Sequence, residues 1–239
     1  MTERQGNGAA FDPTGLTGER LAEMAAAGAE ILECYRVLAK TGDNIVGEIL
    51  RDQGAFVELN HFPDGDVYDA DSGAQYYYHA HRDGEHGHFH TFLRQKGMPA
   101  GMAPVAQSDA DYMHQRDDSL SHLIAISMDS YGFPISLFTT NRWVTADNWY
   151  ACADVLRMLD LFEIDHARPS WPVNRWITAM IKLFRPQIAA LLRDRDDGLA
   201  RWRAAHPDRD PFEDRELEVI SELPISVEDQ IRAVEAARA

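Results

Sequence analysis

Apolar positions spaced three to four residues apart predict helices in several parts of the chain. The ranges with this spacing are 19–40, 45–52 and 176–191. Pro186 should kink or break the third of these helices, because proline lacks a backbone N–H. Thr145 is a suitable N-cap for a further helix, and the spacing of Ser226 and Asp229 matches a capping box at the start of the last one.

Alternating polar and apolar positions between these helices predict β-strands. The strands are expected over 56–61, in a hairpin over 75–94, in a second hairpin made of 121–129 and 134–140, and over 217–220. The acidic stretch 63–71 is expected to be a turn region. Helices that flank hairpin-linked strands favour an α+β fold over a βαβ arrangement, with an antiparallel sheet of about four to six strands packed against the helices.

One domain is expected over residues 16–239, because this length suits a single hydrophobic core and we find no linker within it. Residues 1–15 are polar and contain glycine, which predicts a disordered lead-in. Residues 95–120 show no clear period. A loop of that length inside a compact domain is usually functional or disordered, so this segment is a candidate lid.

Five histidines fall within residues 79–90, on either side of the clearest turn motif in the chain. Asp83-Gly84 between two runs rich in aromatic residues predicts a two-residue type I′ turn. That turn would place three pairs opposite each other: His79 with His88, His81 with His86, and Tyr77 with His90. Because cross-strand partners and alternate residues share a face, all five imidazoles are expected on one side of the hairpin.

Imidazole nitrogen is the commonest neutral ligand for transition metals, so this face predicts a metal site. The candidate ligands are His79, His81, His86, His88 and His90. One ion would use three or four of them, and two ions could share all five. Iron, zinc, copper and manganese are the expected metals. A structural zinc site would more often recruit thiolates, and neither Cys34 nor Cys152 is near, so the donor set resembles that of catalytic sites.

Four further residues are candidates for chemistry beside the metal. Glu85 could act as a base or orient a ligating imidazole, although a tight turn would point it away from the histidines. Tyr77 shares the histidine face and could donate a proton. Arg94 on the same face and Arg142 after the second hairpin could bind an anionic substrate group, or form structural ion pairs instead. His122 is expected at the edge of the core and not as a ligand.

The charge of the chain narrows its partners. Acidic residues number 39 and basic residues 23, which gives a formal net charge of −16. This charge argues against nucleic acid and anionic membranes as partners. The chain also contains no apolar run of membrane-spanning length and no apolar signal region near its start, so a cytoplasmic location is expected. A small-molecule substrate is the expected ligand, and the oligomeric state is left open.

These features predict a metal-dependent enzyme with a mononuclear or dinuclear non-haem site. The alternatives are a non-catalytic metal-binding or accessory protein and a histidine cluster that responds to pH. An enzyme should bury the histidines in a pocket, whereas a metal store should expose them. A pH-responsive cluster should change state between about pH 5 and 7, where histidine titrates.

Two longer motifs extend beyond the histidines. The first joins Tyr-Tyr-Tyr-His-Ala-His at 76–81 to Glu-His-Gly-His-Phe-His-Thr-Phe-Leu-Arg at 85–94, and the second is Thr-Thr-Asn-Arg-Trp-Val-Thr at 139–145. Together they resemble an uncharacterised bacterial family, a domain of unknown function. The resemblance spans most of the chain and implies no particular activity.

Part of the first motif has a second resemblance. Gly73, His79-Ala80-His81 and Glu85 have the spacing that opens the first motif of the cupin superfamily. This resemblance implies a small β-barrel in which His79, His81 and Glu85 bind iron, manganese, nickel or zinc. Phe92 stands where the cupin motif has glycine, and the sequence contains no second cupin motif.

Overall fold

The computed structural model describes residues 11–107 and 119–239. Six strands form one antiparallel sheet, and their order in the sheet follows their order in the chain. The strands are β1 Phe62–Tyr68, β2 Ala74–His79, β3 Gly87–Arg94, β4 Leu120–Met128, β5 Pro134–Thr140 and β6 Val219–Pro224. The predicted α+β class and antiparallel sheet are confirmed. Because β1 and β6 are the two edges of the sheet, the barrel implied by the cupin resemblance is not formed.

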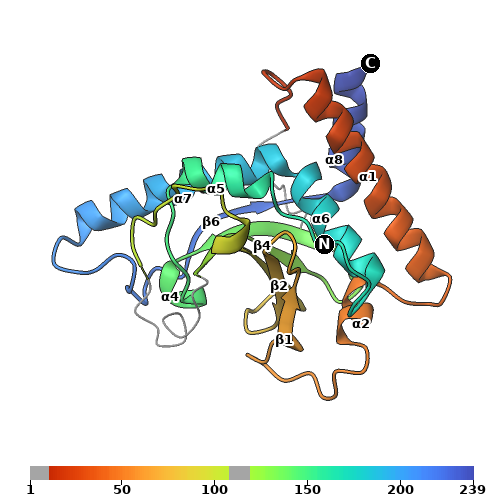
Figure 1. The fold of residues 1–239 in the computed structure, drawn as a ribbon, viewed down its shortest axis with the longest axis horizontal. Helices are drawn as coiled ribbons and strands as arrows, with labels where there is room; N and C mark the ends of the chain where they lie inside the picture. Colours follow the sequence, from red (N-terminus) through yellow and green to blue (C-terminus); the bar gives the residue numbers. More distant parts are fainter. Residues whose placement is uncertain (1–10, 108–118) are drawn as a thin grey trace, which may run out of the picture.

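Helices cover one face of this sheet (Figure 1). The long helices α6 and α7 run across it, and α1 and α8 pack together beside α6. The helices are α1 Gly18–Ala39, α2 Ile45–Leu50, α4 Arg142–Thr145, α5 Cys152–Leu159, α6 Trp171–Leu183, α7 Arg185–Ala205 and α8 Val227–Arg238, with the 3₁₀ helix η1 Gln95–Gly97 after β3. The helices bury the apolar side chains of one face of the sheet, and the other face carries polar side chains together with Tyr77, Phe92 and Phe138.

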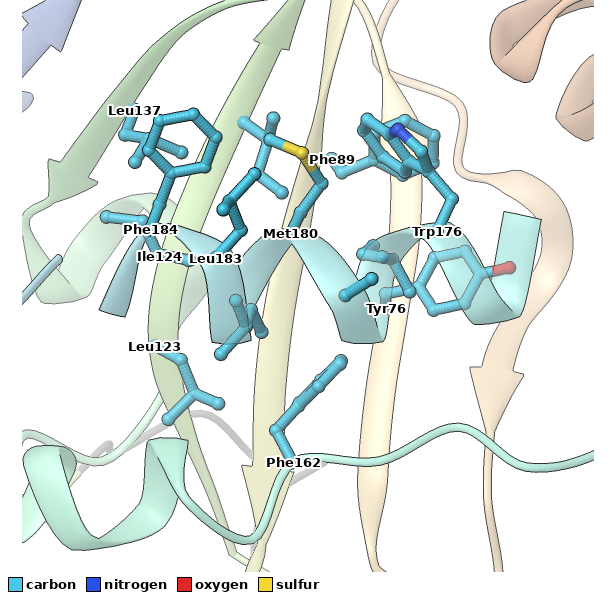
Figure 2. Packing of buried hydrophobic residues seen from close by; sticks show 14 of the residues in the cluster. Tyr76, Phe89, Leu123, Ile124, Leu137, Phe162, Trp176, Met180, Leu183 and Phe184 are labelled. Atoms are coloured by element: carbon cyan, nitrogen blue, oxygen red, sulfur yellow. The ribbon is translucent and has the colours of Figure 1, made fainter. Parts of the chain in front are cut away.

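The main core lies between the sheet and α6. Figure 2 shows Tyr76 and Phe89 from neighbouring strands pointing toward Trp176 of that helix. The Phe89 and Trp176 rings lie 5.5 Å apart, and all three side chains are fully buried. Successive side chains of a strand point to opposite faces. The strand neighbours of Tyr76 and Tyr78 on β2, and those of Phe89 on β3, therefore face away from this core.

Replacing Trp176 by alanine should lower the free energy of unfolding by about 3–5 kcal/mol, the usual cost of removing a large buried aromatic side chain. The substitution also removes the hydrogen bond that the indole Nε1 donates to Tyr35 Oη over 3.1 Å. Urea unfolding at neutral pH would measure the change. Trp171 is 46% exposed and is the matched control, so its replacement should cost less than about 1 kcal/mol. Equal losses from both variants would contradict this account of the core.

Several predicted elements are confirmed, and others are wrong in type or in their bounds. The helix over 176–191 is broken as expected, and Pro186 lies in the first turn of α7. The strand predicted over 56–61 is wrong: β1 begins at Phe62 and includes part of the predicted acidic turn. An edge strand tolerates such polar residues, and a bulge between Phe62 and Val67 accommodates Gly65 with a φ of 83°.

The start expected at Thr145 for the next helix is also wrong, because Thr145 ends α4 and its hydroxyl donates to Asp147 Oδ1 over 2.7 Å. The next helix, α5, begins only at Cys152. Most of the predicted lead-in over 1–15 and the middle of the candidate lid over 95–120 lie outside the described residues. In the part of the chain that the structure describes, no helix combines the length and apolar character needed to cross a bilayer.

Candidate metal centre

The site lies on the face of β2 and β3 that points away from the helices. His79 pairs with His88 and Tyr77 with His90, in the register predicted from the sequence. Their neighbours Tyr76, Tyr78 and Phe89 belong to the main core, so strand alternation places the histidines on the opposite face. His88 and His90 are nevertheless fully buried, and His79 is only 7% exposed.

The connection between these strands differs from the predicted turn. Strand pairing stops at His79 and His88, and residues 80–86 form a loop. Gly84 has a φ of 88°, but Asp83 does not have the positive φ that a type I′ turn also requires. The two-residue turn was therefore wrong. The loop is longer than a two-residue turn because the backbone N–H of His86 donates to Met128 O of β4, so the chain pairs with β4 at this point and not with β2.

His86 consequently leaves the histidine face. Its Nδ1 lies 2.7 Å from Tyr78 Oη, and its ring stacks on Phe56 with a centroid distance of 5.1 Å. Tyr78 belongs to the core face of β2. The prediction that all five imidazoles share one face was therefore wrong for His86, and the structure does not bring it to the other four.

The remaining imidazoles converge through their ring nitrogens. His88 Nε2 lies 2.7 Å from His79 Nε2 and 3.1 Å from His90 Nε2. His79, His81 and His88 offer nitrogens that all lie within 4.8 Å of one another, so this group could hold a metal ion. Nitrogens bound tetrahedrally to zinc at 2.0–2.1 Å would be about 3.3 Å apart, so small side-chain movements would admit an ion.

Glu85 lies inside this site. Its carboxylate contacts His88 Nδ1 and accepts a hydrogen bond from Ser127 Oγ. The expectation that Glu85 points away from the histidines was therefore wrong, because the longer loop lets it fold back under His88. Burial opposes ionisation, but the contacts with His88 and Ser127 lower the pKa of Glu85. An ionised carboxylate only accepts, so His88 carries its proton on Nδ1 and directs an Nε2 lone pair toward His79.

A histidine from β4 extends the cluster. His90 Nδ1 lies 2.9 Å from His122 Nε2, and the backbone N–H of His122 donates to Asp147 Oδ2 over 2.7 Å. Strict alternation along β4 would put His122 on the same side as Ile124, at the edge of the core, as expected from the sequence. A bulge in the β3–β4 pairing, between Thr91 and Phe92, instead puts His122 on the histidine face. Its partner across the sheet is Phe92, which no local sequence pattern specifies.

Burial keeps four of these imidazoles uncharged, namely those of His79, His88, His90 and His122. It lowers the pKa of His79 to about 2 and that of His122 to about 3. Neighbouring histidines lower the pKa of His79 further, and the charge of Arg195 lowers that of His122. Burial also lowers the pKa values of His88 and His90, although the contact with Glu85 opposes the shift at His88. Neutral imidazoles have a lone pair available, which is the form that binds metals.

Of the other predicted site residues, two lie on the histidine face and one does not. Tyr77 lies on the histidine face, with its ring stacked on His61 at 3.6 Å. Arg94 lies on the same face, but its Nε donates to Gln75 Oε1 over 2.6 Å. Arg142 is buried in α4, where it pairs with Glu213 and donates to Gln107 O. The structure therefore does not bring Arg142 to the histidines.

An open cleft adjoins the β1 side of this face. Its volume is 780 Å³, and it is lined by Leu59, Asn60, His61, Asp64, Gly65, Asp66, Tyr68, Gln75 and Arg94. The His61 ring meets the edge of the His79 ring at 5.7 Å, so the cleft ends beside the cluster. A small molecule in this cleft would be separated from His79 only by the side chain of His61.

Comparison with known proteins identifies a family. The profile of a family described as "Domain of unknown function (DUF6969)" matches residues 25–225, which include every strand and the whole cluster. This match confirms the resemblance to an uncharacterised domain family that the two longer motifs indicated. No curated protein and no solved structure gives a significant match to the chain.

Proposed function

Since the chain belongs to the DUF6969 family, whose function is unknown, we propose from the site itself that it is a metal-dependent enzyme acting on a small molecule. His79, His81 and His88 are the proposed ligands, and His90 is adjacent to them. The metal would supply Lewis-acid catalysis or an activated water when bound. Iron, zinc, copper and manganese remain the candidate ions, since imidazole binds several transition metals.

The observation that carries the proposal is the contact between Glu85 and the outer nitrogen of His88. A ligating histidine usually donates its second N–H to a carboxylate, which fixes its tautomer and its orientation. His81 has a carboxylate nearby but not hydrogen-bonded to it, because its Nδ1 lies 3.9 Å from Glu218 Oε1. An imidazole held between a carboxylate and other imidazoles is preorganised for binding an ion.

Burial favours catalysis over metal storage. A store should expose its ligands, whereas His88 is fully buried and His79 nearly so. His81 is half-buried, with 22% of its side chain exposed, so the cluster meets solvent at the end nearest the loop 80–86. The same burial means that His79 and His122, with pKa values of about 2 and 3, do not titrate in the folded protein between pH 5 and 7, so the folded cluster does not switch its charge in that range.

Elemental analysis would test the proposal directly. Untagged protein, purified without chelators or nickel resin, should contain one of the four candidate metals at near-stoichiometric amount. Protein reconstituted anaerobically with each metal is the second arm. If no metal binds in either arm, the proposed function is wrong.

The role of Glu85 can be tested by replacing it with glutamine. The amide is nearly isosteric but carries no charge, so it would hold His88 less firmly in the required tautomer. Metal affinity should fall by about 10–100-fold, the usual effect of losing such a partner. Competition with a chromophoric chelator would measure the affinity. Glu228→Gln is the matched control, because Glu228 is exposed and pairs only with Arg232 among the described ion pairs. Unchanged affinity in Glu85→Gln would contradict the assigned role.

A further inference from the structure

We propose that Arg82 binds the carboxylate group of a small organic substrate beside the metal centre. The inference deepens the proposed function and rests on it, since it places the substrate next to the three histidine ligands. Arg94 and Arg142 were the arginines expected from the sequence for this purpose. The contacts of Arg82 make it the better candidate.

Arg82 reaches from the loop 80–86 across the histidine face of the sheet. Its guanidinium lies 4.1 Å from the centre of the Phe138 ring on β5, and its Nη2 donates to Glu222 Oε2 on β6 over 3.2 Å. The Phe138 ring meets the His88 ring edge-on at 5.2 Å. Ala125 of β4 pairs with both His90 and Phe138, so the ring beneath the guanidinium lies on the same face of the sheet as the histidines.

One nitrogen of this guanidinium has no acceptor. Arg82 Nη1 is buried and has no hydrogen-bond partner among residues 11–107 and 119–239. The nearest carboxylate oxygen in a described ion pair is Glu85 Oε2, at 3.7 Å, which is too long for a hydrogen bond. Buried polar groups are almost always paired, so this guanidinium nitrogen is a donor that a ligand oxygen beside the candidate metal centre would satisfy.

The surroundings indicate which acceptor fits. A guanidinium is planar and matches a carboxylate, with which it forms strong charge-assisted hydrogen bonds. Glu85, Glu218 and Glu222 already surround Arg82 and His81. With one arginine and a divalent ion among three carboxylates, a ligand with a single negative charge is favoured over a doubly charged phosphate.

Access also favours a ligand at this position. The side chains of Arg82 and His81 are 21% and 22% exposed, whereas His88 is fully buried. A ligand would therefore approach from the side of the loop 80–86 and meet His81 and Arg82 first. Its carboxylate would then lie between the guanidinium and the ion, where one carboxylate oxygen would accept a hydrogen bond from Nη1.

The test uses the full-length protein loaded with Co(II), whose visible absorption reports on ligands near the metal. Titration with acetate should shift the bands in the wild-type protein, and acetamide should not. Arg82→Gln should weaken acetate binding about tenfold or more, because it removes one charge-assisted contact. Co(II) affinity should stay within about twofold, because Arg82 is not one of the proposed metal ligands. Arg82→Lys should be intermediate, since lysine keeps the charge but not the planar fork.

Two further variants separate binding from structure. Glu222→Gln removes the ion pair but keeps the guanidinium, so acetate should bind at least as tightly as in the wild type. Arg232→Gln removes the same charge from an exposed arginine of α8 and should change nothing. If Arg82→Gln binds acetate like the wild type, the inference is wrong and the metal centre stands.

Three further outcomes concern Co(II) binding and the choice between carboxylate and phosphate. Loss of Co(II) binding in Arg82→Gln would show that Arg82 only holds the metal ligands in place, and would overturn the inference. Tighter binding of inorganic phosphate than of acetate would overturn the assignment of a carboxylate. Failure of the wild-type protein to bind Co(II) would contradict the proposed function instead.

Discussion

Replacing His88 by alanine should abolish stoichiometric metal binding. His88 Nε2 is the nitrogen that contacts both His79 and His90, so its removal leaves the other imidazoles without their common neighbour. It also leaves the carboxylate of Glu85 buried without its histidine partner. The loss of affinity should exceed about 100-fold, the upper end for loss of an outer partner such as Glu85. Elemental analysis and chelator competition would measure it.

Two other histidines are matched controls for this prediction. His206 follows the end of α7, and its ring stacks on that of Trp202 with a centroid distance of 4.3 Å. His86 lies on the core side, beside Tyr78. Alanine at either position should leave the metal content unchanged. Retention of metal by His88→Ala would discredit the site, and its loss from His86→Ala would show that the loop 80–86 has a different conformation when metal is bound.

Acid should destabilise the metal-free protein steeply below about pH 6.5. Burial lowers the pKa values of His79, His88, His90 and His122 in the folded state. Below the ordinary histidine pKa of about 6.5, the unfolded chain therefore takes up protons that the folded protein refuses. Each such histidine contributes about 1.4 kcal/mol per pH unit, and stability is lost as pH falls from about 6.5 toward the folded pKa values.

Asp147 opposes this trend over part of the range. Burial raises its pKa to about 6, although the backbone N–H of His122 and the Thr145 hydroxyl act in the opposite direction. A raised pKa means that the folded protein holds a proton that the unfolded chain releases, so this contribution is present at low pH and is lost as pH rises through about 6. Four histidines with lowered pKa values against one aspartate with a raised pKa leave a net loss of stability as pH falls from about 6 to 5.

Urea unfolding of chelator-treated protein at about pH 7 and about pH 5.5 would measure this dependence. His122→Gln should reduce the slope, because it removes one of the four buried imidazoles. His206→Ala should leave the slope unchanged, since His206 is outside the cluster. Identical unfolding midpoints at the two pH values would contradict the neutral, buried state of the histidines.

The hairpin shows how far local patterns reach. Alternation along β2 and β3 was sufficient to predict that His79 faces His88 and Tyr77 faces His90. The Asp83-Gly84 pair correctly located the bend, but its type was wrong because β4 pairs with the chain at His86. A turn motif describes the preference of an isolated hairpin, and a third strand can override it.

The positions of Glu85 and His122 could not be predicted for the same reason. Glu85 contacts Ser127 of β4, which is 42 residues away in the sequence. His122 reaches the histidine face only through the bulge between Thr91 and Phe92, which exists only when β3 and β4 are paired. A bulge shifts every later side chain to the other face, so one such feature reverses an inference based on alternation.

The sequence by itself determined the start of α8 at the Ser226 cap, the antiparallel α+β class, and the pairing of two histidines across one hairpin. These features depend on periods of two or about 3.6 residues and on nearest neighbours, which are local properties. Only the tertiary structure decided which histidines converge, that Glu85 supports them, and that Arg82 lies over Phe138 beside them. Those contacts join residues far apart in the chain, and the burial that keeps the imidazoles neutral arises only when the whole sheet is assembled.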